Sequence, residues 1–138
     1  MWRFVFVLLL LGGCGAHGAR WEIIIHTSDK EGAGTDSDIY ITLHGSRGSS
    51  AEISLGNADK NYFERNQIDR FFVTTDDIGD VCSLTIRSAG NYICPSWHVR
   101  EILVQGRIMQ RFWCDCLLSG KTEYQKEIYP DVPCSRLQ

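Results

Sequence analysis

Oxygen-bearing side chains cluster in three connecting segments of the sequence. Calcium takes six to eight oxygen ligands from carboxylates, side-chain amides and backbone carbonyls, and "GAGTD" and "GNADKN" offer that mixture with glycines that free the backbone. The alternative is that Asp, Asn and Gly merely form turns in solvent-exposed loops. The clusters are Asp29, Glu31, Asp36 and Asp38; Asn57, Asp59, Asn61 and Glu64; and Asp76, Asp77 and Asp80.

Five of the six cysteines lie in the second half of the chain. In an oxidising compartment they predict two disulfide bridges and one remaining thiol, either free or linked to another chain, with the pairing left open. A zinc site at "CDC" is the rival interpretation. It is disfavoured because a single residue separates the two thiolates and no second metal-ligand pair follows. The candidates are Cys82, Cys94, Cys114, Cys116 and Cys134.

The sequence gives little support for catalysis. His26, His44 and His98 fall in alternating segments, at positions opposite in parity to the expected core residues. "HGSRG" at residues 44–48 has His44 where a GxSxG nucleophile motif needs glycine. A reactive cysteine would also need a neighbouring base and a pocket. We therefore predict that the protein is not an enzyme.

The N-terminal segment reads as a secretory signal peptide of residues 1–18, with Arg3, an apolar run and small residues at its end. The run is about half of the roughly 20 apolar residues that a membrane span needs. A permanent anchor and a lipid-modified Cys14 are the alternatives. Removal of residues 1–18 leaves 13 basic against 17 acidic side chains, a net charge near −4. Such a charge argues against nucleic-acid binding, and we expect a secreted, extracellular protein.

The remaining residues, 19–138, suffice for one domain with a cysteine-containing tail at about 130–138. Apolar and polar residues alternate almost throughout, which predicts an all-β sandwich, and "GSRGSS" at 45–50 predicts a hairpin turn. The expected strands are Trp21–Thr27, Asp38–Gly45, Ala51–Leu55, Asp69–Thr75, Val81–Ser88, Trp97–Gly106, Ile108–Leu118 and Glu123–Tyr129.

The residue patterns of two of these segments predict further details of how the strands pack. In 38–45, the isoleucines and the leucine share one face, as expected of a strand packed on a second sheet. In 97–106, the apolar parity changes between Val99 and Ile102. The inward face is kept there only if a bulge lies near Arg100 and Glu101.

Five motifs occur in the order found in the PLAT domain, the β-sandwich of polycystins, lipoxygenases and clostridial alpha-toxin, which the chain resembles over residues 21–130. The resemblance implies two four-stranded sheets, no catalysis, and delivery of proteins to membranes or to protein partners. One departure is Asn66, where the family usually has glycine. The motifs are "GAGTDSDIYITLHG" (32–45), "NYFERNQIDRFFV" (61–73), "DDIGDVCSLTIR" (76–87), "PSWHVREILV" (95–104) and "FWCDCLL" (112–118).

The resemblance also implies calcium ligands in three loops. Simple up-and-down alternation of strands would place the loop at Asp76 at the opposite end from Asp36, so only a crossover between sheets would unite them. Carried over by position, the implied ligands are Gly32, Gly34 and Asp36; Asn57 and Asp59; and Asp76 and Asp77.

Contact residues are scarce in the loops. We predict Tyr62, Tyr92, Ile93 and Trp113 as membrane or partner contacts. Phe63, Phe71, Phe72 and Trp97 are instead expected to pack in the core or on a sheet face. The leading hypothesis is a calcium-assisted module that attaches to membrane lipid or to a lipid-associated partner. Its rivals are a calcium-independent protein-binding module and an adaptor for a separate lipase or receptor.

Overall fold

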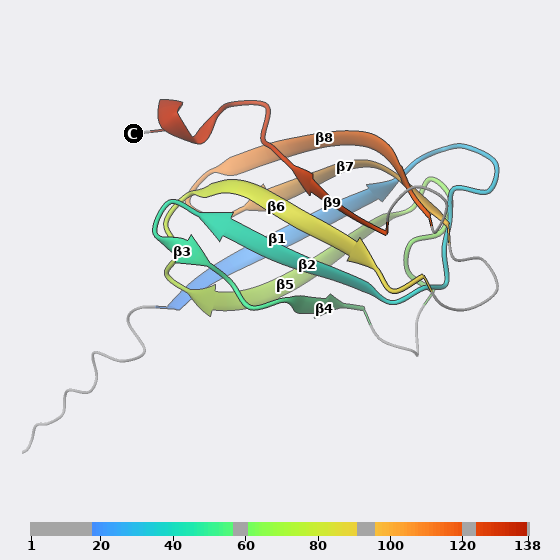
Figure 1. The fold of residues 1–138 in the computed structure, drawn as a ribbon, viewed down its shortest axis with the longest axis horizontal. Helices are drawn as coiled ribbons and strands as arrows, with labels where there is room; N and C mark the ends of the chain where they lie inside the picture. The colour runs from blue at the N-terminus through green and yellow to red at the C-terminus, as the bar shows by residue number, and fades with distance from the viewer. Residues whose placement is uncertain (1–17, 57–60, 91–95, 120–123, 138) are drawn as a thin grey trace, which may run out of the picture.

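The computed structural model describes residues 18–56, 61–90, 96–119 and 124–137 (Figure 1). In these ranges no helix has the length and hydropathy to cross a membrane. The elements are β1 (Gly18–Thr27), β2 (Ile39–Gly45), β3 (Gly48–Ser49), β4 (Ile53–Leu55), β5 (Ile68–Asp76), β6 (Val81–Ser88), β7 (Trp97–Gln105), β8 (Met109–Leu118), β9 (Gln125–Ile128) and the 3₁₀ turn η2 (Cys134–Arg136).

The strands form two antiparallel sheets that face each other. One sheet has four strands in the order β5-β1-β7-β8. The other has five strands: four pair in the order β3-β2-β6-β9, and the fifth, β4, also pairs with β2. The prediction of an all-β sandwich is confirmed. The fifth strand arises because β3 pairs with the end of β2 and β4 with its beginning. β3 lies inside the segment predicted as a hairpin turn.

The core lies between the sheets and is built by alternation along the strands. Ile39, Ile41 and Leu43 of β2 are fully buried, as predicted. Trp97 and Phe112 are the largest fully buried side chains among the described residues. The Trp97 Nε1–H donates to Thr27 Oγ1 at 3.0 Å, which satisfies the indole inside the core.

The predicted bulge is present in β7. The pairing of β7 with β8 shifts between Val99 and Glu101, and the pairing of β1 with β7 also passes over Arg100. Opposite Arg100, β8 supplies two residues, Cys114 and Asp115, and Asp115 has a positive φ of 47°. The shift keeps the apolar residues on both sides of it in the core.

Two disulfides form among the described cysteines, one between the C-terminal tail and β6 and one within β8. A disulfide joins Cys82 in β6 to Cys134 in η2, 52 residues apart. A second joins Cys114 to Cys116 across the bulge. Cys94, the fifth predicted candidate, lies outside the described residues.

The connections fall at two ends of the sandwich. The loop of residues 28–38 leaves the end of β1 at one end, whereas the turns 45–48, 76–81 and 105–109 lie at the other (Figure 1). β5 connects the two ends. From its first to its last residue, this nine-residue strand spans about 27 Å at the antiparallel rise of ~3.4 Å per residue.

Candidate functional site

The loop of residues 28–38 carries part of the predicted calcium site and is anchored by backbone hydrogen bonds. Thr35 N–H donates to Phe63 O at 3.0 Å, and His98 N–H donates to Ala33 O at 3.0 Å. A Cβ on Gly34 would lie 3.1 Å from both Phe63 O and Arg65 N. Glycine at position 34 therefore lets the acidic loop pack directly on the segment that follows Asn61.

That neighbouring segment is held by the buried carboxylate of Asp69. Its Oδ2 accepts from Phe63 N–H at 2.8 Å, and its Oδ1 accepts from Gln67 Nε2 at 2.6 Å. Phe63 and Asn66 both adopt positive φ, at 62° and 57°. Asparagine tolerates this left-handed region better than most residues, which accounts for Asn66 where the family usually has glycine.

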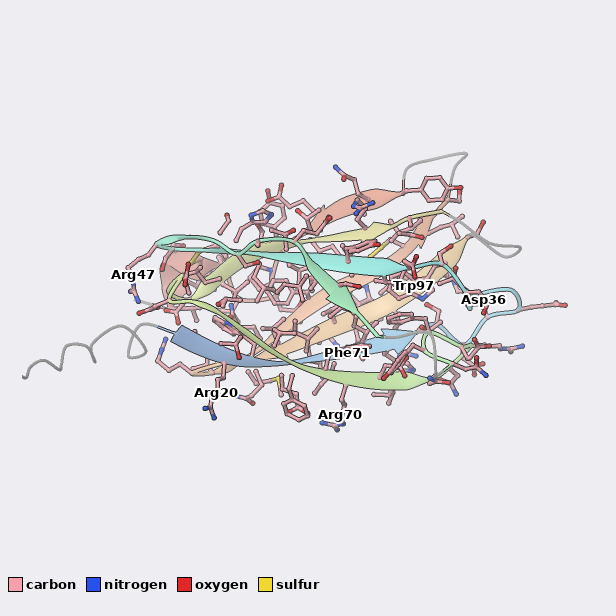
Figure 2. The ribbon with its side chains drawn as sticks, turned by 90° about the horizontal axis from the view of Figure 1, so that it is seen from below. Arg20, Asp36, Arg47, Arg70, Phe71 and Trp97 are labelled. Atoms are coloured by element: carbon pink, nitrogen blue, oxygen red, sulfur yellow. A yellow bond between two sulfur atoms is a disulfide. The ribbon has the colours of Figure 1, made fainter. Side chains whose placement is uncertain are left out.

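The structure separates the implied calcium ligands. Gly32 and Gly34 share a loop with Asp36, whereas Asp76 ends β5 at the other end of the sandwich. Asp77 Oδ1 accepts from Arg47 Nη2 at 2.6 Å. Figure 2 shows Arg47 and Asp36 at opposite ends of the molecule. No crossover unites the loops, so Asp76 and Asp77 cannot share an ion with Asp36.

The remaining implied ligands, Asn57 and Asp59, lie outside the described residues. Within the ranges that the structure describes, no group of three or more His, Cys, Asp or Glu side chains is arranged to hold a metal ion. The seven residues therefore do not fit a single calcium site. The loop with Gly32, Gly34 and Asp36 is the part of the set that stays together.

The histidines are engaged in local hydrogen bonds. His44 contacts Ser49 Oγ and Thr85 Oγ1 at 2.9 and 2.8 Å. His98 Nδ1 lies 2.6 Å from Ser28 Oγ, a pair that would suit nucleophilic catalysis if the serine were accessible. Ser28 is only 3% exposed. Burial of the His98 imidazole, aided by nearby Lys30, lowers its pKa below the ordinary value.

The predicted contact residues have different surroundings. Trp113 is 42% exposed on the outer side of β8. The Tyr62 ring is half-buried, with its centroid 5.1 Å from that of Phe71, so it packs against the core. Tyr92 and Ile93 lie outside the described residues. The prediction that Phe72 is a packing residue is wrong, because it is 80% exposed.

Phe72 belongs to a larger exposed surface, the outer side of the β5-β1-β7-β8 sheet. Among the described residues, seven large hydrophobic side chains are exposed, and five of them lie on this side: Ile68, Phe72, Met109, Trp113 and Leu117. The guanidiniums of Arg100 and Arg111 lie 5.6 and 5.0 Å from the Trp113 ring centroid. We call this surface the apolar–arginine face. The five side chains lie on β5 and β8, the two edge strands of this sheet, and flank β1 and β7. Exposed apolar side chains gathered on one side of a sheet suit an interaction surface.

Strand parity could have found Phe72. Adjacent residues in a strand point to opposite sides of the sheet, so Phe71 and Phe72 cannot both enter the core. Phe71 is the buried member, at 9% exposure.

Comparison with known sequences identifies related domains. The PLAT/LH2 domain family matches residues 21–129. Mouse lipoxygenase homology domain-containing protein 1 is 34% identical over 120 residues, which cover 83% of this chain and 6% of that protein. Human polycystin-1-like protein 3 is 33% identical over 118 residues, which cover 80% of this chain and 7% of that protein. The chain thus spans less than a tenth of the length of these relatives.

Comparison with solved structures identifies the same architecture. The crystal structure of coral 8R-lipoxygenase, described as activated by calcium through a C2-like domain, matches with a TM-score of 0.74 and 25% identity. The match covers 81% of this chain and 17% of that chain.

Proposed function

Because this chain belongs to the PLAT/LH2 domain family, we propose that it is a non-catalytic module for attachment to membrane lipid or to a lipid-associated partner protein. Calcium assists this attachment at the loop that carries Gly32, Gly34 and Asp36. The chain covers only a small part of its relatives, so the proposal concerns the module and not the activity of the larger proteins.

The observation that carries the proposal is the apolar–arginine face. Exposed aromatic and aliphatic side chains suit the boundary between lipid headgroups and acyl chains, where apolar burial and positive charge both contribute. Arg100 beside Trp113 supplies positive charge there, whereas Arg111 is paired with Glu101 and Asp131. The strand pairing places Ile68 opposite His26, next to the end of β1. Leu117 lies opposite His98, near the start of β7. These residues therefore lie toward the end of the sheet from which the Asp36 loop extends.

The calcium element of the proposal is supported by the Asp36 loop and by the calcium activation of the coral relative. With a net charge of −3 for the whole chain, attraction to anionic lipid needs a cation between them. The ion would supply that bridging charge. The loop offers the Asp36 carboxylate, and Asn57 and Asp59 are the nearest implied ligands in the sequence.

A sedimentation assay with vesicles tests the proposal. The full chain is mixed with phosphatidylserine–phosphatidylcholine vesicles, with calcium or with chelator. We expect more protein in the pellet with calcium, and loss of that increment in Asp36→Ala. Asp76→Ala is the matched control, because it removes an implied ligand at the other end of the sandwich and should leave the increment intact.

The apolar–arginine face also fits a second candidate function, calcium-independent binding of a protein partner. Aromatic residues and arginines are enriched in the centres of protein interfaces. Absence of pelleting with these vesicles, both with calcium and with chelator, would contradict lipid attachment and favour this alternative. A remaining thiol, such as that of Cys94, could link such a partner covalently.

A further inference from the structure

The disulfide within β8 joins two cysteines that are only two residues apart, Cys114 and Cys116. In a regular antiparallel strand such residues lie roughly 6.8 Å apart, at a rise of ~3.4 Å per residue. Here the two Cα atoms are 5.1 Å apart, inside the range of about 4.4 to 6.8 Å in which a disulfide forms. The strand is therefore contracted at the point where the bond spans it.

The residue between the two cysteines, Asp115, has the backbone that accompanies this contraction. Its φ of 47° lies in the left-handed region, which residues other than glycine occupy at a cost in free energy. Asp115 and Cys114 together lie opposite the single residue Arg100 of β7. The disulfide thus holds Asp115 in a costly conformation, and opening of the bond removes that constraint.

The Cys114–Cys116 bond has less to keep it closed than Cys82–Cys134. A bond across a single residue restricts the unfolded chain far less than a bond between residues 52 apart. Cys114 is half-buried and Cys116 is 7% exposed, so a thiolate from solution reaches Cys114 Sγ first. Cys82 and Cys134 are also half-buried, so the backbone constraint and the short loop, not access, distinguish the two bonds. Constrained disulfides are the ones that small thiols reduce.

Asp115 also connects this disulfide to the Asp36 loop. Its Oδ1 lies 3.5 Å from Nζ of Lys30, a residue of the loop, and 3.8 Å from His98 Nε2. His98 in turn fastens the loop to β7, because its N–H donates to Ala33 O at 3.0 Å. A change in the conformation of Asp115 therefore acts on two groups that position the loop.

We propose that Cys114–Cys116 is a redox site that exchanges reversibly with small thiols and thereby controls how firmly the Asp36 loop is held. A thiolate attacks Cys114 Sγ, the bond between the two cysteine sulfurs breaks, and Cys116 leaves as a thiolate that takes up a proton. A second thiolate attacks the reductant's sulfur in the mixed disulfide and releases Cys114, which is protonated in turn. Two small thiols are thus oxidised to one disulfide, and the protein gains two electrons and two protons.

A redox titration of the full chain tests the exchange. The protein is equilibrated in mixtures of reduced and oxidised glutathione, first in increasing and then in decreasing proportion of the reduced form, and free thiols are alkylated before tryptic mapping. The peptide of residues 112–121 contains Cys114 and Cys116 and no other cysteine. We expect this pair to open and close reversibly. Cys82–Cys134, the internal control, should stay closed until the ratio [GSH]²/[GSSG] is at least about tenfold higher.

Amide hydrogen exchange tests the link to the loop. We expect reduction of the pair to speed exchange at the amides of Ala33 and His98 at least about threefold, because both take part in hydrogen bonds that hold the loop. Exchange at Leu84, which is fully buried in the opposite sheet, should stay unchanged. That control separates loosening of the loop from loss of global stability.

A variant with the disulfide closed isolates the part played by Asp115. Asp115→Asn removes the charge that contacts Lys30 and keeps a residue type that tolerates positive φ. It should speed exchange at the same loop amides without any reductant. Asp131→Asn is the matched control, because Asp131 is an exposed carboxylate that pairs with Arg111 of β8 and should leave the loop amides unchanged.

Each outcome decides the proposal. A pair that stays closed until Cys82–Cys134 opens, or that is reduced in every mixture, overturns the redox site. Reversible reduction with unchanged exchange at Ala33 and His98, or equal effects of Asp115→Asn and Asp131→Asn, overturns the link to the loop. These measurements need neither calcium nor lipid, so their failure is distinct from failure of the calcium-assisted attachment proposed above.

Discussion

Phe71 and Phe72 are neighbours in β5 and have opposite environments. The Phe71 ring packs against Phe63 at a centroid distance of 5.7 Å, whereas Phe72 extends from the apolar–arginine face. Their chemical identity is the same, so composition alone cannot separate a core role from a surface role. The separation comes from the alternation of side chains along a strand and from knowing which parity faces the second sheet.

We expect the two phenylalanines to respond differently to truncation. Phe71→Ala should lower the free energy of unfolding by about 3 to 5 kcal/mol, because it leaves a cavity in the core. Phe72→Ala should change it by less than about 0.5 kcal/mol, because the side chain is exposed. Urea unfolding followed by tryptophan fluorescence measures both. Equal losses would contradict the assignment of the two faces.

His98 gives a prediction for acid stability. Burial lowers its pKa in the folded protein relative to the ordinary value of 6.5. Below pH 6.5 the unfolded chain therefore binds a proton that the folded imidazole resists, so stability should fall as pH decreases from 7 through the folded pKa. Melting temperatures between pH 7 and pH 5 measure this effect. His98→Asn should flatten the decline, and an unchanged slope in that variant would exclude His98 as its source.

At the scale of elements, the eight expected strands are all present, and the exact limits of β6 were predicted from its alternation. The bulge at Arg100 was predictable because two apolar pairs of opposite parity can share one core only if the register shifts. β3 was not predictable, since its two residues, Gly48 and Ser49, read as part of a turn. Sheet order also depends on long-range pairing that no local pattern encodes.

The two disulfides differ in the length of chain that they close. Cys82–Cys134 closes 52 residues, for which chain-entropy estimates give about 4 kcal/mol. Replacing both cysteines with serine should lower the free energy of unfolding by about 2 to 4 kcal/mol. Cys114→Ser with Cys116→Ser is the control, and it should cost clearly less, because that loop contains only a few residues. Guanidinium unfolding compares the two variants, and a reversed order would contradict the loop-length argument.

At the scale of the whole molecule, the sequence predicted the sandwich and the family, and strand alternation already placed the Asp76 loop at the opposite end from Asp36, whereas the family resemblance implied that both supply ligands to calcium. Asp36 and Asp77 each lie in an acidic loop, and both matched positions in the family pattern. The pairing of β1 with β5 places them at opposite ends, because β5 runs the full length of the sheet between them.

The distance between the two ends determines how the molecule would sit on whatever it binds. If the Asp36 loop contacts a membrane surface, the start of β1 lies away from that surface by about the length of β5, a nine-residue strand of roughly 27 Å. The sandwich would then act as a rigid spacer that holds the start of β1 at a fixed height above that surface.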